Sequence, residues 1–326
     1  MNGLIVVGAG AMGWNHARVC SELGILAAVV DQDHTTLKAI SEKFRVPTYL
    51  DLNQAIVDLE PTGAIISTPT KTHYNLGVSM IKLGLNVLIE KPISDTIEKG
   101  EKLVKIAREK GVVLSVGHIE RYNPVIPIAK EKIMNGDWGD IVTITSTRVS
   151  NFPGRIRDVG VILDLGIHDI DNCIFLMGSN PKKVYAHAGR INDIEYEDHA
   201  TISIEFENGK QATIEVNWIT PMKVRSLSLT CEKAFVSLDY INQEIDVSSS
   251  VFKDPGNPNL FPQRIEFQTK TIDLIKDEPL RLEIVDFVNA IKNGHKTSVT
   301  GEQGLLALKV ALAALKSIES GVVIDV

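Results

Sequence analysis

The sequence predicts an α/β protein, with a doubly wound parallel sheet followed by an α+β domain that has a large open, mostly antiparallel sheet. Short apolar runs alternate with amphipathic helical segments over residues 1–118, which is typical of buried parallel strands joined by helices. Apolar and polar residues alternate over much of residues 119–326, which favours antiparallel strands with one buried face. Because 326 residues exceed what one core usually fills, we expect two domains, 1–118 and 119–326.

The first domain contains five apolar runs that we expect to be strands, joined by right-handed crossovers. The runs are residues 4–7, 26–30, 63–66, 86–89 and 112–116. The segments with helical periodicity between them are residues 11–23, 34–44, 51–59, 72–83 and 95–110. This alternation predicts one parallel sheet covered by helices.

The second domain has the two-residue alternation of strands. After a helix near 122–134, the expected strands are residues 140–149, 182–190, 200–207, 211–218, 224–230 and 234–240. Two closing helices are expected at 279–292 and 302–318. Residues 249–263, which are rich in proline and glycine, are expected to form a loop.

One hairpin in the second domain allows its register to be predicted. A three-residue loop at 207–209 sets Ile204 opposite Ala212, so apolar side chains share one face. A two-residue loop would set Ile204 opposite Thr213, which mixes apolar with polar. We therefore expect a bulged hairpin in which Gly209 is left-handed.

Composition disfavours several functional classes. The net charge of −7 argues against a nucleic-acid partner, which requires a basic surface. Cys20, Cys173 and Cys231 lie far apart, so we expect small buried side chains in a reducing cytoplasm, without a disulfide framework or metal site. No leader-like segment or long apolar run is visible, so we expect a cytoplasmic protein with no membrane partner.

Residues 8–13 match G-x-G-x-x-G, directly after a predicted strand and at the start of a predicted helix. In this context the first glycine permits a tight turn, the second admits a pyrophosphate, and the third lets helix and strand pack closely. Asp31, which ends the second strand, would accept hydrogen bonds from the adenosine ribose and repel a 2′-phosphate. The pattern therefore predicts NAD as cofactor, with NADP less favoured; the alternative is a glycine-rich turn that binds nothing. The expected cofactor-binding residues are Gly8, Gly10, Ala11, Met12, Gly13 and Asp31.

Four motifs in this order resemble the glucose–fructose oxidoreductase/inositol dehydrogenase (Gfo/Idh/MocA) family. They are residues 8–13, Ser67 to His73, Glu90-Lys91-Pro92, and Asp164 to Asp171. The resemblance implies a Rossmann domain, then an open antiparallel sheet whose outer face makes the contacts of a homodimer or homotetramer. Residues 117–124 and 155–171 are similar to the UDP-N-acetylglucosamine 3-dehydrogenase group. One departure is that only Gly160 remains of the glycine-rich stretch before Asp164.

Oxidation of a secondary alcohol requires a base, a group that stabilises the developing alkoxide, and a nicotinamide held close. If residues 162–176 form a helix, Asp164 and His168 lie one turn apart on one face, and the carboxylate could orient the imidazole. His168 is then the candidate base. The resemblance assigns Lys91 to substrate contact and catalysis, so Lys91 could instead be the base while His168 positions the hydroxyl.

Other residues are expected around this site. Thr68, Pro69, His73, Glu90 and Lys91 would line the cofactor, and Arg121, Tyr122 and Asn123 would meet the substrate where the domains join. Arg155 and Arg157 could clamp the diphosphate of a nucleotide sugar, or be ordinary surface arginines. We place His16 among the structural histidines, and expect Asp169 and Asp171 to cap the helix or face solvent.

These observations predict an NAD(P)-dependent oxidoreductase that moves a hydride between a secondary hydroxyl and the nicotinamide. The expected substrate is a sugar or nucleotide sugar, with C3 of UDP-N-acetylglucosamine as the best candidate. One alternative is a non-catalytic NAD(P)-binding sensor of the same fold. Another is an enzyme that uses tightly bound NAD for a transient oxidation.

Overall fold

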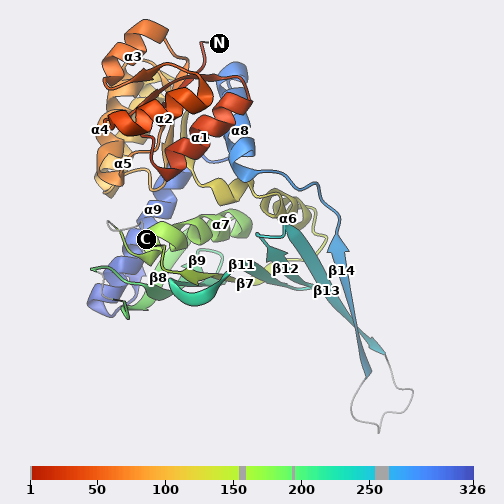
Figure 1. The fold of residues 1–326 in the computed structure, drawn as a ribbon. Helices are drawn as coiled ribbons and strands as arrows, with labels where there is room; N and C mark the ends of the chain where they lie inside the picture. The colour runs from red at the N-terminus through yellow and green to blue at the C-terminus, as the bar shows by residue number, and fades with distance from the viewer. Residues whose placement is uncertain (1, 154–158, 193–194, 254–263) are drawn as a thin grey trace. The chain divides into compact units, whose positions relative to one another are not determined.

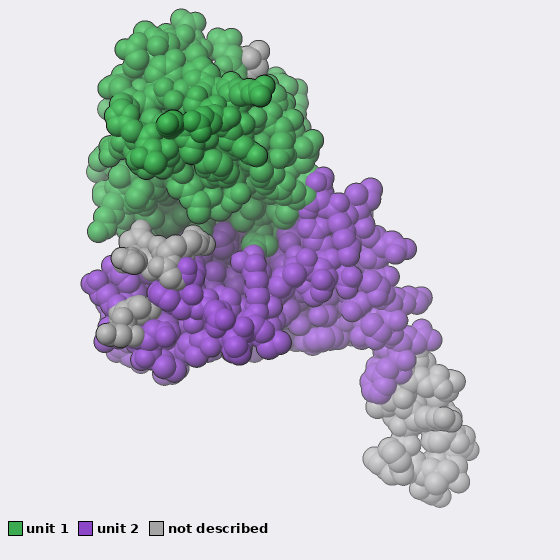
Figure 2. Space-filling view, viewed as in Figure 1, with its two compact units in different colours: residues 1–122, 278–309 green, residues 123–277, 310–326 purple. Residues whose placement is uncertain are grey.

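The computed structural model describes residues 2–153, 159–192, 195–253 and 264–326. The chain divides into two compact units, shown in different colours in Figure 2. Unit 1 comprises Met1–Tyr122 and Glu278–Lys309, and unit 2 comprises Asn123–Asp277 and Val310–Val326. The expected division at 118/119 differs from this one because a segment near the C-terminus joins the first unit.

In the described part of the chain, unit 1 contains a six-stranded parallel sheet in the order β3-β2-β1-β4-β5-β6. The strands are β1 (Leu4–Val7), β2 (Leu26–Val30), β3 (Thr48–Tyr49), β4 (Gly63–Ile66), β5 (Asn86–Glu90) and β6 (Leu114–Gly117). This is the doubly wound order, so the predicted fold of the first domain is confirmed. Only β3 was not expected, because two residues are too few to give a periodic signal.

The helices of unit 1 are close to their predicted bounds. They are α1 (Ala11–Glu22), α2 (His34–Phe44), α3 (Leu52–Leu59), α4 (Thr70–Lys82) and α5 (Ile97–Lys110). Side-chain oxygens of Asp33, Asp51 and Thr96 accept backbone N–H groups at the starts of α2, α3 and α5. Local chemistry therefore determines where these helices begin.

Helix α8 (Pro279–Asn293) belongs to the core of unit 1 although it lies far along the chain. Leu280, Ile284 and Phe287 are buried in the same cluster as residues of β1 and α1. Helix α9 (Gly301–Ser320) follows, and its first part also belongs to this unit. Burial of this apolar stripe explains why α8 packs onto unit 1 although it follows unit 2 along the chain.

Unit 2 is built on a large, mostly antiparallel sheet, as predicted. Over the described residues this sheet has nine strands, three more than expected, in the order β14-β13-β12-β11-β7-β10-β9-β8-β15. Its strands are β7 (Ile141–Asn151), β8 (Pro181–Gly189), β9 (His199–Phe206), β10 (Gln211–Asn217), β11 (Ile219–Cys231), β12 (Phe235–Asp239), β13 (Glu244–Lys253), β14 (Arg264–Ile272) and β15 (Ile324–Asp325). The β10–β7 pair is parallel. Helices α6 (Val125–Met134) and α7 (Ile167–Met177) pack against this sheet.

The predicted hairpin register is confirmed. Ala212 pairs with Ile204, and Gly209 has a φ of 79°. The N–H of Phe206 donates to the carbonyl of Lys210 at 2.9 Å, which closes the three-residue loop. Side-chain alternation was therefore sufficient to determine the register.

The expected loop at 249–263 is wrong over its first part. Residues 249–253 lie in β13, which pairs with β14, and the two strands continue as a ribbon (Figure 1). Residues 254–263 lie outside the described part of the chain. In the described part, no helix combines the length and hydropathy needed to cross a membrane.

Candidate functional site

The glycine turn follows β1 and begins α1. Gly8 has a φ of 90°, and a side-chain carbon there would lie 2.8 Å from the carbonyl oxygen of Ser67. At Gly13 the same carbon would lie 1.8 Å from the carbonyl oxygen of Gly8, so helix and turn touch closely. At Gly10 it would meet no atom within 4 Å. Ala11 and Met12 begin α1, whose N-terminal N–H groups suit a phosphate. This turn has the shape that a dinucleotide requires.

Asp31 lies directly after β2 and accepts a hydrogen bond from the glycine turn. One carboxylate oxygen accepts the N–H of Ala9 at 2.6 Å, and the other accepts the N–H of Asp33 at 2.9 Å. A carboxylate has about four lone-pair positions, so capacity remains for ribose hydroxyls. The side chain is therefore fixed in place before any ligand arrives.

The loop after β4 lies beside the glycine turn, because β4 pairs with β1 where the strand order reverses. Ligands of such sheets bind at this switch point, beyond the carboxyl ends of the strands. The Ser67 hydroxyl donates to the Gly8 carbonyl at 2.8 Å. Pro69 precedes α4, and the Thr68 and Thr72 hydroxyls are 2.6 Å apart. Thr68 and Pro69 thus lie at the edge of the sheet that carries the glycine turn, and their cofactor role stays a prediction.

His73 is buried and joins two loops at the same sheet edge. Its Nδ1 is 2.9 Å from the Pro92 carbonyl oxygen, and its Nε2 is 2.8 Å from that of Thr68. Burial lowers the pKa of His73, although both carbonyls oppose this effect. A neutral ring donates to only one of them. Among the described contacts, His73 ties the loop after β4 to the loop after β5, and its cofactor role stays a prediction.

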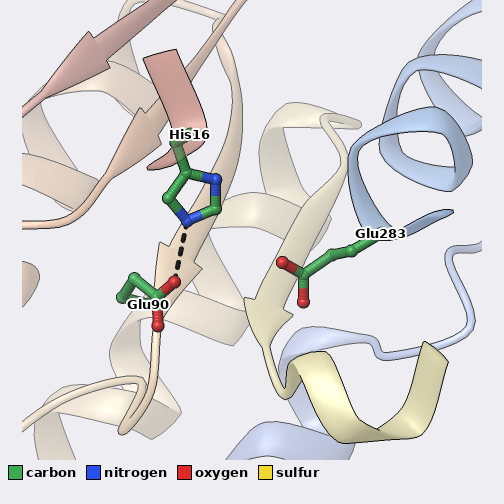
Figure 3. A group of neighbouring side chains, drawn as sticks. All are labelled: His16, Glu90 and Glu283. Carbon is green, nitrogen blue, oxygen red and sulfur yellow. Dashed lines mark hydrogen bonds and ion pairs between the residues drawn. The ribbon is translucent and has the colours of Figure 1, made fainter. Parts of the chain in front are cut away.

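Glu90 ends β5 and is paired with a histidine that the sequence reasoning classed as structural. Its Oε1 is 2.7 Å from Nε2 of His16, and its Oε2 accepts the N–H of Lys91 at 3.2 Å. Glu283 of α8 brings a second carboxyl group to the same place (Figure 3). His16 lies three residues after Gly13, and this spacing from the glycine turn was the signal that could have identified it. No local pattern could have identified Glu283.

Lys91 begins the loop after β5 and is half-buried. The Lys91–Pro92 peptide bond is cis. Because β1, β4 and β5 are neighbours in that order, Lys91 and the glycine turn lie at the same edge of one sheet. Two strand spacings separate them by about 10 Å, a span that an extended dinucleotide can bridge.

Arg121, Tyr122 and Asn123 are all buried and contact protein atoms. The Tyr122 hydroxyl donates to Asp286 at 2.8 Å, and burial is the main cause that raises its pKa. The Asn123 amide donates to the Tyr240 carbonyl at 3.0 Å. These contacts support local structure, and the substrate role of the three residues stays a prediction.

The segment that carries Asp164 and His168 is helical, but it is not a continuous α-helix. Ile162–Gly166 forms a π-helical turn, η2, that runs directly into α7. Hydrogen bonds in a π turn join residues five apart, so four residues fall short of a full turn there. The expected α-helix over 162–176 is therefore corrected at its first turn, and the placement of Asp164 and His168 on one face stays a prediction. Asp164 is half-buried and His168 is 9% exposed. Such π turns are frequent at functional sites.

Asp169 neither caps the helix nor faces solvent, contrary to expectation. It is 1% exposed and is 2.5 Å from Nε of Arg148 on β7. The Ser146 hydroxyl also donates to it at 2.7 Å. Asp171 is buried as well. The Asp169–Arg148 pair links the start of α7 to β7, and removing either partner alone would typically cost about 3–5 kcal/mol because it would leave an unpaired buried charge. Arg155 and Arg157 lie outside the described residues.

Comparison with known families matches both halves of the chain. Residues 3–118 match the model of the oxidoreductase family with an NAD-binding Rossmann fold, and residues 128–237 match the GFO/IDH/MocA C-terminal domain. Relatives include the UDP-N-acetylglucosamine 3-dehydrogenase of Acidithiobacillus ferrooxidans, 26% identical over 316 residues that cover 97% of this chain and 96% of the relative. The inositol 2-dehydrogenase of Rhizobium meliloti is 29% identical over 327 residues, 96% of each chain.

Solved structures agree with this assignment. The UDP-N-acetylglucosamine 3-dehydrogenase of Acidithiobacillus ferrooxidans superposes with a TM-score of 0.86, at 26% identity and with 97% of each chain covered. Its likeness extends over both units, as do the two family models together. The chain therefore belongs to the GFO/IDH/MocA oxidoreductase family and is an NAD(P)-dependent dehydrogenase.

Proposed function

We propose that the protein oxidises a secondary hydroxyl of a sugar or nucleotide sugar, with NAD as cofactor and C3 of UDP-N-acetylglucosamine as the preferred position. The observation that carries the proposal is the placement of Lys91 after β5, on the same sheet edge as the glycine turn. The named activity of a relative that covers nearly the whole chain supports the choice of substrate.

The glycine turn fits NAD. The space beside Gly10 is empty of protein atoms and can admit a pyrophosphate, whereas neighbouring backbone lies against Gly8 and Gly13. When bound, NAD supplies the acceptor of the hydride. Either Lys91 or His168 would take the hydroxyl proton. Whichever of the two does not take the proton would hydrogen-bond the same oxygen. Asp164 would orient His168. A positively charged group at that oxygen stabilises the alkoxide as its charge develops.

Substrate class can be tested with the two arginines of residues 155–157. We expect wild-type protein to bind UDP-N-acetylglucosamine more tightly than free N-acetylglucosamine, because two arginines can clamp a diphosphate. An Arg155→Ala/Arg157→Ala protein should lose roughly tenfold or more of this preference, by calorimetry. Equal affinity of wild type for the two ligands would reject the nucleotide-sugar proposal. Faster NAD reduction with inositol than with either sugar would favour a cyclitol substrate, in line with the second relative.

The choice between NAD and NADP is predicted to depend on Asp31. In an Asp31→Ala variant, the ratio of kcat/KM for NAD to that for NADP should fall by roughly tenfold to a hundredfold. Loss of the carboxylate removes repulsion of the 2′-phosphate together with the ribose contact. Steady-state rates at the NADH absorbance band measure this ratio. Because Asp31 also accepts the Ala9 N–H, the melting temperature of the variant must be compared with that of wild type. An unchanged ratio would contradict the assignment.

We also propose that the face of the nine-stranded sheet that carries Phe235 and Phe267 makes the subunit contact of a homodimer or homotetramer. These side chains are 48% and 76% exposed. Phe235 lies on the face opposite the buried one, because its neighbour Val236 is buried. Phe235 pairs with Ser248, and Ser250, two residues further along the same strand, pairs with Phe267, so Phe267 lies on the same face as Phe235. Native mass spectrometry should show an oligomer that Phe267→Lys weakens. A monomer at all concentrations would contradict this.

A further inference from the structure

His16, Glu90 and Glu283 form a buried cluster of one imidazole and two carboxyl groups in unit 1. Their exposed fractions are 0%, 7% and 0%, and one nitrogen or oxygen of each lies within 4.8 Å of the others. They come from α1, β5 and α8, and the Glu283 carboxyl group points toward the other two (Figure 3). Three separate parts of unit 1 therefore place titratable groups together, directly beside Lys91.

The hydrogen bonding of this cluster is uneven. Glu90 has two partners, the His16 ring at 2.7 Å and the Lys91 N–H at 3.2 Å. Among the described residues, neither carboxyl oxygen of Glu283 has a hydrogen-bond partner, and Nδ1 of His16 has none either. A buried polar atom without a partner is costly, and a buried charge without one is far more so. Nδ1 of His16 and the carboxyl group of Glu283 belong to the same cluster, so a hydrogen bond between them would give both a partner.

The surroundings of Glu283 disfavour a negative charge. Glu90 of β5 and Asp286 on the same helix are both acidic, and Tyr122 of the turn before α6 is a neutral neighbour. Burial, then these two carboxyl groups, raises the pKa of Glu283 well above its usual value. By contrast His16, Lys91 and His73 face Glu90, whose pKa is lowered despite burial. The two carboxyl groups are thus driven to opposite protonation states.

We propose that Glu283 is a protonated acid that donates a hydrogen bond to Nδ1 of His16, while Nε2–H of His16 donates to the Glu90 carboxylate. A small rotation of the Glu283 side chain, or one bridging water, completes the link. Every polar atom of His16 is then satisfied with only one negative charge in the cluster. The consequence for catalysis rests on the proposed function: Glu283 and His16 are positioning residues that hold Glu90 as an oriented anion next to Lys91.

A divalent cation is the competing occupant, since a histidine and two carboxylates are suitable ligands. Ligand atoms of one tetrahedral ion lie about 3.4 Å apart, given bonds near 2.1 Å. Nε2 of His16 and Oε1 of Glu90 are 2.7 Å apart, which is a hydrogen-bond distance. The distance between His16 and Glu90 therefore favours a shared proton over a bound cation. The experiments below test for a cation as well.

The test compares two substitutions that separate a neutral donor from a charge. Glu283→Gln keeps an uncharged side chain that can donate to Nδ1 of His16, whereas Glu283→Leu keeps the bulk and removes the donor. We expect Glu283→Gln to hold its Kd for NAD within about threefold of wild type. Glu283→Leu should weaken NAD binding by roughly tenfold, as expected for one lost buried hydrogen bond that orients Glu90. Exposed Glu319→Gln is the matched control.

Two spectroscopic readouts need neither substrate nor turnover. Infrared difference spectra at pH 7 should show the C=O band of a protonated carboxylic acid in wild type and in Glu319→Gln, and not in Glu283→Gln. Nitrogen NMR should report His16 as the neutral Nε2–H tautomer, and the Glu283→Leu variant should shift its Nδ1 signal. Because these spectra use the NAD-free protein, a failed sugar assay leaves them unaffected.

Three results would overturn the proposal. The first is an infrared spectrum of wild type without a protonated-acid band that depends on Glu283. The second is a loss of NAD affinity in Glu283→Gln as large as in Glu283→Leu, which would indicate an ionised Glu283 paired with a charged His16. The third is a stoichiometric metal ion in the purified protein that Glu283→Gln removes, which would assign the cluster to a cation.

Discussion

Lys91→Ala is expected to lower kcat by about 10²- to 10⁴-fold, the contribution typical of a positioned acid or base. Lys91 directly follows β5 at the sheet edge that carries the glycine turn, which is where the reacting hydroxyl is expected. NAD affinity should change by only a few fold, because the glycine turn and Asp31 are untouched. Steady-state NADH formation gives kcat, and calorimetry on the enzyme without substrate gives the Kd for NAD.

Two further variants make this result interpretable. Lys82→Ala removes an exposed lysine at the end of α4 and should behave as wild type. Lys91→Arg keeps the charge but cannot lose a proton, because the guanidinium stays protonated. Lys91→Arg should be as inactive as alanine if Lys91 is the base, and partly active if it only stabilises the alkoxide while His168 takes the proton. Full activity in Lys91→Ala would remove the residue from the mechanism.

Gly13→Ala is expected to destabilise unit 1 by about 3 kcal/mol or more and to abolish NAD binding. The added carbon would lie 1.8 Å from the Gly8 carbonyl oxygen and 2.7 Å from the Ser67 hydroxyl, so α1 must move away from the turn. Overpacking of this kind typically costs about 1–3 kcal/mol, and here the obstructing atom is backbone that cannot rotate away. The melting temperature should fall by roughly 6–12 °C in a calorimetric scan.

Gly10→Ala is the matched control, because the same added carbon meets no protein atom within 4 Å and φ is −64°. Its melting temperature should stay near that of wild type, while its affinity for NAD falls, since the carbon stands where the pyrophosphate is expected. A stable Gly13→Ala that still binds NAD would show that helix and turn do not need this contact. Loss of stability in Gly10→Ala would show that the turn is tighter than the structure indicates.

The elements that the sequence predicted well have signals confined to neighbouring residues. The buried strands of unit 1 are continuous apolar runs, and the Ile204–Ala212 register follows from alternation on either side of Gly209. Strand β3 has two residues and could give no such signal. The ribbon of β13 and β14 was missed because proline and glycine favoured a loop over 249–263.

In the candidate site, too, some features could be predicted from the sequence and others could not. The glycine turn and Lys91 are recognisable because each directly follows a strand, so position along the chain implies position on the sheet edge. The π turn before α7 was not predicted, because a single turn of five-residue hydrogen bonding leaves no periodic trace. Asp169 was misjudged because its partner, Arg148, lies on a different element.

Sequence by itself determined the alternation of strands and helices in unit 1, the glycine turn and the family, because these depend on short motifs and on the period of apolar residues. Tertiary structure alone decided that α8 returns to unit 1, that Asp169 is buried against Arg148, and that Glu283 meets the His16–Glu90 pair. The physical reason is that burial and electrostatic pairing depend on distance in space. A carboxyl group that reads as surface in the sequence becomes a buried acid only when two other elements enclose it.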